Sequence, residues 1–137
     1  MTVDMTIIGQ LFDHPGYFTA SWPGMRELTR RMAAKGMLVT DATKPPTGPP
    51  IEELAGMPPE EREVAGAWLR YHPEGSVGIP WWKLHSNDYW HVTSEECRQA
   101  MEVWESSGDP AEDVDEWWAD WLRFLEAGAV ADGFTVA

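Results

Sequence analysis

The stretch at about residues 80–93 constrains the fold of this chain more than any other part of the sequence. Two short runs rich in aromatic and branched side chains, residues 81–85 and 89–92, flank Ser86-Asn87-Asp88, whose residue types tolerate turn conformations. This pattern predicts a central β-hairpin with a three-residue loop, since that register keeps the apolar side chains on one face. The buried face would consist of Trp82, Leu84, Trp90 and Val92.

The opposite face of the predicted hairpin is a candidate site for binding a ligand or a partner. It mixes aromatic rings with imidazoles, an amine and polar turn residues, a combination that can stack on planar molecules and pair with anions. Its members are Trp81, Lys83, His85, Asn87, Asp88, Tyr89 and His91. An ordinary half-solvated sheet face shows the same alternation, so a purely structural role stays open.

A metal site or a catalytic pair has less support in the sequence. His85, His91 and Asp88 could converge on a zinc ion, but they match no familiar ligand spacing, and we expect no metal and no cofactor. A pair such as His91 with Asp88, or His72 with a glutamate, arises by chance in any acidic chain. The sequence also lacks a phosphate-binding glycine loop, a dinucleotide fingerprint and a serine elbow. An enzyme is therefore the less favoured interpretation.

Charge is distributed unevenly along the chain. The 137 residues carry a formal net charge of −13, and residues 94–137 hold twelve Asp and Glu against only Arg98 and Arg123. Such a field repels nucleic-acid backbones and attracts a basic partner surface, so we expect no direct binding of nucleic acid. The acidic interaction face predicted on the last helix consists of Glu112, Asp113, Asp115, Glu116 and Asp120. The alternative is that the acid only keeps a chain with nine tryptophans in solution.

The second half of the chain carries the clearest helix signals. Thr93-Ser94-Glu95-Glu96 is a capping box that predicts a helix start, with Cys97 on the buried side of that helix. Asp109-Pro110 is expected to begin the last helix and Gly128 to end it. The apolar stripe of the last helix comprises Val114, Trp117, Trp118, Trp121, Leu122 and Leu125. Residues 134–136 either add a final strand or fold against the core.

The first 40 residues are predicted to form a strand, a helix and a second strand. Residues 5–12 suit a strand, although a short helix is also open, and residues 37–40 suit a second strand beside it. Between them, Ser21 is a plausible N-cap for a helix that ends near Gly36. The polar face of this helix carries Arg26, Arg30, Arg31 and Lys35. We expect this basic cluster to pair with the acidic C-terminal part, within the chain or between subunits.

The middle of the chain is predicted to contain a connector and one more helix. Residues 44–50 are rich in proline, which excludes a helix or a central strand and indicates an extended connector. A helix opens at Pro58-Pro59 with acidic residues in its first turn, and His72-Pro73 stops it. Its apolar stripe comprises Val64, Ala67, Trp68 and Tyr71.

Together these signals predict one α+β domain of residues 1–137. We expect a small, mostly antiparallel sheet built around the hairpin and packed by three to four amphipathic helices. The N-terminus lacks a secretory signal, and no apolar run reaches the length of a membrane span. A single cysteine, Cys97, fits a reducing compartment, so we expect a cytoplasmic protein with no role at a membrane. Cys97 has no base in its sequence surroundings that would make it a nucleophile.

Part of the sequence resembles a segment of small uncharacterised proteins of actinobacteria and their phages. The resemblance covers about the last 60 residues and rests on the following positions: Gly78-Ile79-Pro80, Lys83-Leu84, Ser86-Asn87-Asp88, Trp90, Val92-Thr93, Glu96 and the terminal Gly133-Phe134-x-Val136. Tyr89 departs from this pattern, which has a small residue there. The resemblance implies a cytosolic function linked to a host or a phage, and it implies no catalytic residue.

The predicted function is that of a non-catalytic, acidic binding module. We expect it to engage a protein partner through the acidic helix face or the aromatic hairpin face, and a homo-oligomer stays open. The alternative is a small-ligand-binding protein or a metal-dependent enzyme that uses the hairpin face.

Overall fold

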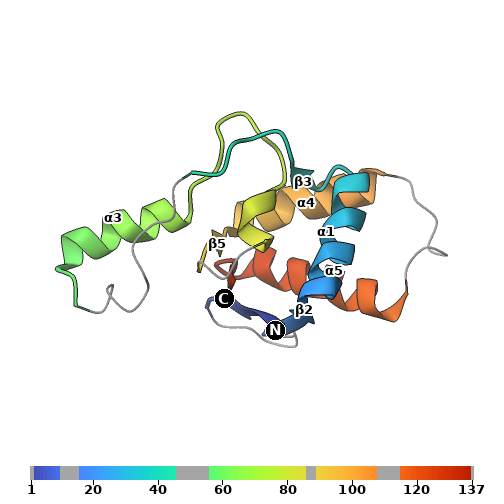
Figure 1. Cartoon of the computed structure of the whole chain (residues 1–137), viewed down its shortest axis with the longest axis horizontal. Coiled ribbons are helices and arrows are strands. Elements are labelled where there is room, and N and C mark those ends of the chain that lie inside the picture. The colour runs from blue at the N-terminus through green and yellow to red at the C-terminus, as the bar shows by residue number, and fades with distance from the viewer. Residues whose placement is uncertain (1, 10–15, 46–55, 86–88, 108–114, 137) are drawn as a thin grey trace.

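A computed structural model describes residues 2–9, 16–45, 56–85, 89–107 and 115–136 (Figure 1). Within them, the α-helices are α1 (Trp22–Ala34), α3 (Pro59–Leu69), α4 (Ser94–Ser106) and α5 (Glu116–Val130), and a short 3-10 helix, η1, spans Trp81–Leu84. The strands are β1 (Thr2–Ile7), β2 (Tyr17–Ser21), β3 (Leu38–Val39), β4 (Ile79–Pro80), β5 (His91–Val92) and β6 (Phe134–Val136). The predicted α+β class, with an antiparallel sheet and helices packed on it, is confirmed.

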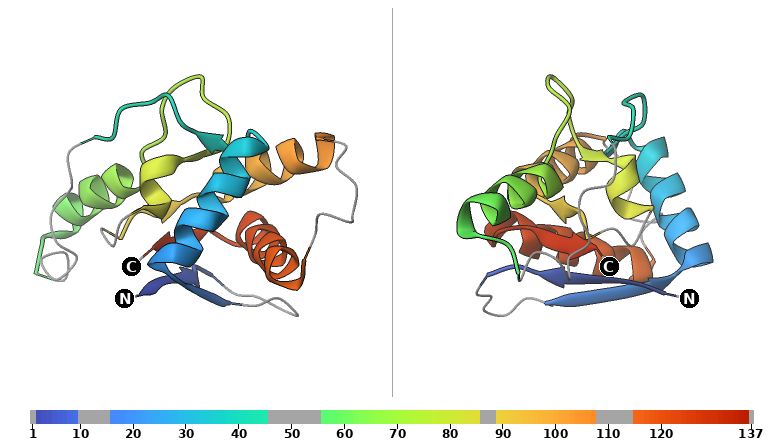
Figure 2. Two further views of the ribbon diagram at one scale, coloured as in Figure 1. Left: turned by 45° about the vertical axis from the view of Figure 1, so that its right-hand side comes forward. Right: turned by 60° about the vertical axis from the view of Figure 1, so that its left-hand side comes forward.

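The main sheet has the strand order β2-β1-β6-β5, and all of its neighbouring strands are antiparallel. Of the two alternatives for residues 134–136, the final strand is formed, and it lies in the centre of this sheet as β6. Along β1, Val3, Met5 and Ile7 alternate with more exposed polar residues, so β1 turns one apolar face toward the helices. Figure 2 shows the helices gathered on one side of the strands.

An aromatic cluster joins α5 to the sheet. Phe134 of β6 packs against Phe124 and Trp121 of α5, with ring centroids 4.9 Å and 6.0 Å apart. Phe18 of β2 contacts the same cluster, at 5.2 Å from the ring of Trp121. These large rings supply much of the apolar area that a small domain needs to bury.

Local capping signals position the helices. The Ser21 hydroxyl accepts a hydrogen bond from the Gly24 N–H (3.1 Å), which confirms the predicted N-cap of α1. The capping box at the start of α4 is also present. The predicted start of the last helix, Asp109-Pro110, lies outside the described residues. Within them, Asp115 caps α5 by accepting from the Trp118 N–H at 2.8 Å.

The predicted end of the last helix at Gly128 is wrong, because α5 continues to Val130. Gly128 is buried against α4, and an added Cβ would lie 2.8 Å from the Cys97 sulfur. This glycine therefore serves the close approach of two helices rather than a helix end. Cys97 is fully buried, as predicted for a core residue.

The hairpin predicted at about residues 80–93 is not formed. Residues 81–84 are the 3-10 helix, while β4 pairs in parallel with β3 and β5 pairs with β6. The strand predicted at residues 37–40, which is β3 in the structure, therefore lies beside β4. It does not lie beside β1 near the N-terminus, as the sequence predicted. Strand β4 has only two residues and ends at Pro80, which lacks an N–H, and the chain then turns into the 3-10 helix instead of extending.

The predicted burial of the apolar residues of the hairpin is confirmed, although the backbone conformation differs from the predicted one. All four predicted core residues are at most 1% exposed: Trp82, Leu84, Trp90 and Val92. The rings of Trp82 and Trp90 meet edge to face with centroids 6.5 Å apart. Burial of these side chains follows from their size and apolarity, and it does not require that they belong to paired strands.

Most of the predicted connector at residues 44–50 lies outside the described residues. Helix α3 follows it in the chain and projects from one end of the molecule, apart from the helices that cover the sheet (Figure 1). None of the described helices combines the length and the apolar composition that crossing a membrane requires.

Replacing Gly133 by alanine should destabilise the protein far more than the same change at Gly75. Both residues have a left-handed backbone, with φ of 76° and 77°, so alanine costs about 1–2 kcal/mol at either position. At Gly133, however, the new Cβ would lie 1.9 Å from the Val92 carbonyl oxygen, whereas nothing lies within 4 Å at Gly75. We expect an additional loss of about 2 kcal/mol or more, measured by urea unfolding. Equal losses would contradict the close β5–β6 contact.

Candidate functional site

The described residues of the predicted binding face do not form one surface. Lys83 is fully buried, and His85 is exposed. The rings of Trp81 and His85 lie together, with centroids 5.9 Å apart, and the Trp81 indole N–H donates to the Ala42 carbonyl at 3.1 Å. The His91 ring nitrogen Nε2 lies 2.6 Å from the Asp132 carbonyl oxygen. Tyr89 is half-buried with a φ of 61°, and Asn87 and Asp88 lie outside the described residues.

Lys83 is buried because a carboxylate meets it inside the protein. Its Nζ donates to the Glu96 Oε1 at 2.7 Å and to the His91 carbonyl at 2.8 Å. Glu96 is itself 1% exposed, and its Oε1 also accepts the Thr93 N–H at 2.9 Å. The carboxylate that completes the capping box of α4 is thus also the counter-ion of a buried ammonium. Burial lowers the pKa of Lys83, and Glu96 opposes this effect.

The second oxygen of Glu96 holds His72. The His72 Nδ1 lies 2.6 Å from the Glu96 Oε2, and its Nε2 lies 2.8 Å from the Ser76 carbonyl oxygen. Both partners act as acceptors, so both ring nitrogens donate when His72 is an imidazolium. The hydrogen bond to Glu96 raises the pKa of His72, which favours this charged form.

The Lys83–Glu96–His72 cluster has a structural role. In the sequence, a pair of His72 with a glutamate is one that arises by chance, and the structure joins His72 to Glu96. Both oxygens of this carboxylate, however, are already hydrogen-bonded in a site where Lys83 and Glu96 have side chains 0% and 2% exposed. In a pair of this kind the imidazole acts as the base, and both ring nitrogens of His72 already have partners, the Glu96 Oε2 and the Ser76 carbonyl oxygen, so neither is placed to accept a proton from a substrate. The cluster instead ties η1 and the loop after α3 to the start of α4.

A further bond fastens the same loop. The Gly78 N–H donates to the side-chain oxygen of Gln99 in α4 at 3.0 Å. Together with His72, this bond anchors the segment between α3 and β4 to the body of the protein. The C-terminal end of α3 is therefore held in place by the segment that follows the helix.

Helix α3 shows the predicted apolar stripe, but the stripe is turned outward. Val64 is 72% exposed, Trp68 36% and Tyr71 42%, and Ala67 is exposed as well. The buried residue of α3 is Ala65, on another side of the helix. Val64, Ala67 and Trp68 thus lie at the spacing i, i+3 and i+4 on one accessible face of α3, and Tyr71 follows two residues beyond the end of the helix; we call these four residues the α3 stripe.

Stacked rings connect the α3 stripe to the core. Trp68 stacks on Tyr71, and Tyr71 stacks on the buried Trp82, with centroids 6.4 Å apart in each pair. The C-terminal half of the stripe is therefore supported by packed aromatic rings. The sequence signal for the stripe was its helical spacing, but spacing alone does not tell which side of a helix faces the core.

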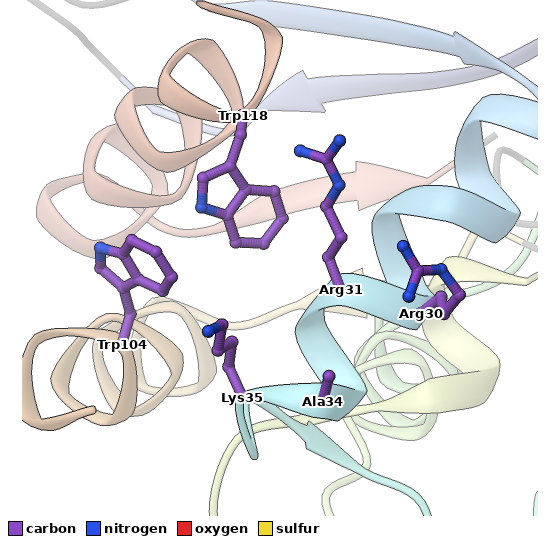
Figure 3. Close-up of a pocket in the computed structure, with 6 residues that line it drawn as sticks. All are labelled: Arg30, Arg31, Ala34, Lys35, Trp104 and Trp118. Carbon is purple, nitrogen blue, oxygen red and sulfur yellow. The ribbon is translucent and has the colours of Figure 1, made fainter. Parts of the chain in front are cut away.

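The basic residues of α1 converge with two indoles on a second surface feature. Arg30, Arg31, Ala34 and Lys35 of α1 line a cleft with Trp104 of α4 and Trp118 of α5 (Figure 3). Its volume is about 310 Å³. Arg31 bridges Glu27 and Asp115 at 3.1 Å and 3.0 Å, so this member of the predicted basic cluster pairs with the acidic C-terminal part, whereas Arg30 pairs with Glu27 of its own helix.

The predicted acidic face on the last helix is partly used inside the molecule. Asp115 caps α5 and pairs with Arg31, and these bonds lower its pKa. Asp120 pairs with Arg123, while Glu116 is exposed. Glu112 and Asp113 lie outside the described residues. Of the three described acidic residues, Asp115 and Asp120 are therefore partly neutralised by arginines of the same chain.

No protein-family model, curated protein or solved structure matches this chain. The part of the chain that the structure describes also contains no group of three or more His, Cys, Asp or Glu side chains that could hold a metal ion.

Replacing His72 by glutamine should destabilise the protein at mildly acidic pH and have less effect as the pH rises. The folded-state pKa of His72 is raised above 6.5, its ordinary value. The stabilisation is thus fully present below the unfolded-state pKa and is lost as the pH rises through the raised folded-state pKa. Urea unfolding of both proteins between about pH 5.5 and pH 9 measures this trend.

His85 provides a control of opposite sign. Although His85 retains exposed surface, partial desolvation by its neighbours lowers its pKa, so protonation of this residue favours the unfolded chain as the pH falls. His85→Gln should therefore cause no loss of stability that grows toward acidic pH. A loss for His72→Gln that is independent of pH would contradict the imidazolium–carboxylate bond.

Proposed function

We propose that this protein is a non-catalytic binding module that docks α3 into an apolar groove of a partner protein. The observation that carries the proposal is the outward-facing α3 stripe, in which Val64 is 72% exposed. Helices that bind in grooves present anchor residues at spacings such as i, i+3 and i+4, which is the spacing of Val64, Ala67 and Trp68 within α3, and Tyr71 follows just beyond the helix end. Single exposed apolar residues are common, but a contiguous stripe of this kind marks an interaction surface.

The way in which α3 is held also supports the proposal. A helix of 11 residues is marginal in water by itself, and α3 buries little of its own surface. The bond from His72 to Glu96 and the stack of Tyr71 on Trp82 hold its C-terminal end against the protein. A helix that is already formed loses less conformational entropy on binding, so the same contacts give a higher affinity.

Charge defines the chemistry of the partner. Glu60 and Glu61 precede Val64 by four and three residues, so both lie on the α3 face that carries the stripe. With a net charge of −13, the whole chain attracts a basic surface and repels nucleic acid. We therefore expect a groove with an apolar floor and a basic rim. Cys97 is buried and free, which supports a partner in the cytoplasm.

Replacing Val64 by aspartate tests the stripe directly. Because Val64 is 72% exposed, the unfolding free energy should change by no more than about 0.5 kcal/mol. Binding should weaken by at least about tenfold, since an apolar anchor is lost and a charge enters the groove. Quantitative affinity capture from the protein's own host would compare the parent with this variant. A photo-crosslinking residue at position 64 should label the same partner, whereas one at position 102 should not. A partner captured equally by Val64→Asp would contradict the proposal.

Glu60→Lys tests the basic rim of the partner. Glu102→Lys is the matched control, because it also leaves a net charge of −11 but lies on α4 at an exposed site. We expect Glu60→Lys to lower the association rate with the captured partner by about threefold to tenfold at low salt, with a smaller effect at high salt. Glu102→Lys should have a clearly smaller effect. Equal effects would show that only the net charge matters and that α3 is not at the interface.

A further inference from the structure

The outer edge of β2 is a surface that can pair with another extended chain. β2 is the first strand of the four-stranded sheet, and β1 is its neighbour among the described strands. It has five residues, whereas β5 at the opposite edge has two. Figure 2 shows β1 and β2 at the lower margin of the molecule. An edge strand of this length presents N–H and C=O groups that a second chain can bind.

The register of β2 shows which backbone groups point outward. The Ile7 N–H donates to the Gly16 carbonyl at 3.0 Å, and the pairing continues as Thr6↔Tyr17 and Asp4↔Thr19. Hydrogen-bonded pairs alternate in an antiparallel ladder, so the backbone groups of Tyr17 and Thr19 face away from β1. Within the described part of the chain, no other strand lies beside β2 to accept them.

The side chains of Tyr17 and Thr19 leave this edge clear. The Tyr17 hydroxyl donates to the Asp4 Oδ1 at 2.7 Å, and the Thr19 hydroxyl donates to the same oxygen at 2.8 Å. Because Asp4 belongs to β1, both side chains lean over the neighbouring strand, away from the outer edge. The outward N–H and C=O groups therefore stay accessible to a further strand.

The sequence of β2 lacks the features that usually prevent pairing at a sheet edge. Such protection comes from charged side chains, prolines or bulges. The strand reads Tyr-Phe-Thr-Ala-Ser, without a charged residue or a proline. Its register with β1 runs without interruption from Thr2↔Ser21 to Thr6↔Tyr17, so it contains no bulge. A strand of this kind is suited to accept a partner.

A cleft beside the edge can hold one side chain of an added strand. It is lined by Tyr17, Phe18 and Thr19 of β2 and by Asp120 and Arg123 of α5, and its volume is about 460 Å³. Phe18 offers apolar surface there, while Asp120 and Arg123 pair with each other. Alternate residues of an added strand point toward the helices. The cleft therefore favours an uncharged, apolar side chain at that position.

Charge decides between a second copy of the chain and a different partner. The chain has a net charge of −13, so two copies repel each other when their β2 edges approach. The same field attracts an extended segment that carries Lys or Arg. Added strands of this kind gain affinity from backbone hydrogen bonds and specificity from pockets for alternate side chains.

We propose that the outer edge of β2 binds an extended, basic segment of a partner protein, which adds to the sheet as an antiparallel strand. One apolar side chain of this segment enters the cleft beside Phe18, and its basic side chains lie on the solvent side of the sheet. The surface is separate from the α3 stripe, so the inference does not depend on the function proposed above.

Titration with the synthetic peptide Lys-Val-Thr-Val-Thr-Val-Lys tests this surface. Its valines lie on one side of an extended strand, and its threonines and lysines lie on the other. We expect saturable shifts of the backbone N–H resonances of Tyr17 and Thr19. Exchange of these two N–H groups with solvent should slow by at least about tenfold at saturation. The N–H groups of Phe18 and Ala20, which face β1, should change less.

Alternate N-methylation of the peptide tests the pairing itself. Residues directly opposite each other in a sheet point their side chains to the same face. The peptide threonines, which share the solvent side with Tyr17 and Thr19, therefore direct their N–H groups toward β2. N-methylation of the threonines should weaken binding by at least about tenfold, whereas N-methylation of the valines should change it by less than about threefold.

Replacing both peptide lysines by glutamates tests the basic character of the segment. The peptide Glu-Val-Thr-Val-Thr-Val-Glu should bind at least about tenfold more weakly at low salt, with a smaller difference at high salt. It keeps the same apolar and backbone groups, so the comparison isolates the charge.

A matched pair of protein variants locates the binding. Thr19→Pro removes the outward N–H, and Thr19→Val keeps it, while both remove the hydroxyl that contacts Asp4. Thr19→Pro should weaken binding of the lysine peptide by at least about tenfold, and Thr19→Val by less than about twofold. Near-ultraviolet circular dichroism shows whether each variant keeps the parent fold. If Thr19→Pro does not fold, the N-methylated peptides decide the question.

Three results would overturn the proposal: no saturable shift at Tyr17 and Thr19, equal binding of the two N-methylated peptides, or unchanged binding by a folded Thr19→Pro variant. Equal binding of the glutamate peptide would overturn the choice of a basic segment. Protection of the Tyr17 and Thr19 N–H groups that rises with the concentration of the protein alone would assign the edge to a second copy and overturn the choice of partner.

Discussion

The carboxylate of Glu96 is the group on which the arrangement of the chain depends most. It accepts the Thr93 N–H at the start of α4, the ammonium of Lys83 and a ring nitrogen of His72. An isolated ammonium or carboxylate costs several kcal/mol to remove from water, so neither Lys83 nor Glu96 would be buried without the other. Through this one side chain, α4, the 3-10 helix η1 and the loop that follows α3 are fixed together.

The position of α3 follows from that cluster. His72 comes just after the end of α3, so the bond to Glu96 holds the exit of the helix while its own side chains stay largely in solvent. The stack of Tyr71 on Trp82 adds a contact between the α3 stripe and the core. A buried charge cluster and an exposed apolar stripe are thus neighbouring parts of one arrangement, in which the first positions the second.

The acidic and basic side chains of the protein are likewise positioned by tertiary contacts. Arg31 joins α1 to the first residue before α5 through Asp115, and its guanidinium lies over the indoles of Trp117 and Trp118. The paired acids therefore contribute to the fold, and α1 brings positive charge to a cleft in a strongly negative molecule. The aromatic residues of α4 and α5 form the core on one side and line this cleft on the other.

Signals that act over a few residues determined the starts of α1, α3 and α4 and the burial of Trp82, Leu84, Trp90 and Val92, because capping and apolar size are local properties. Pairing is not local. Leu38 lies opposite Ile79 and Val92 lies opposite Phe134, and these remote partners replaced the expected hairpin. The tertiary structure alone decided that Lys83 turns inward and that the stripe of α3 turns outward. A short stretch of sequence gives the size and polarity of a side chain. The free energy of burying that side chain depends also on the groups that other segments of the chain place beside it.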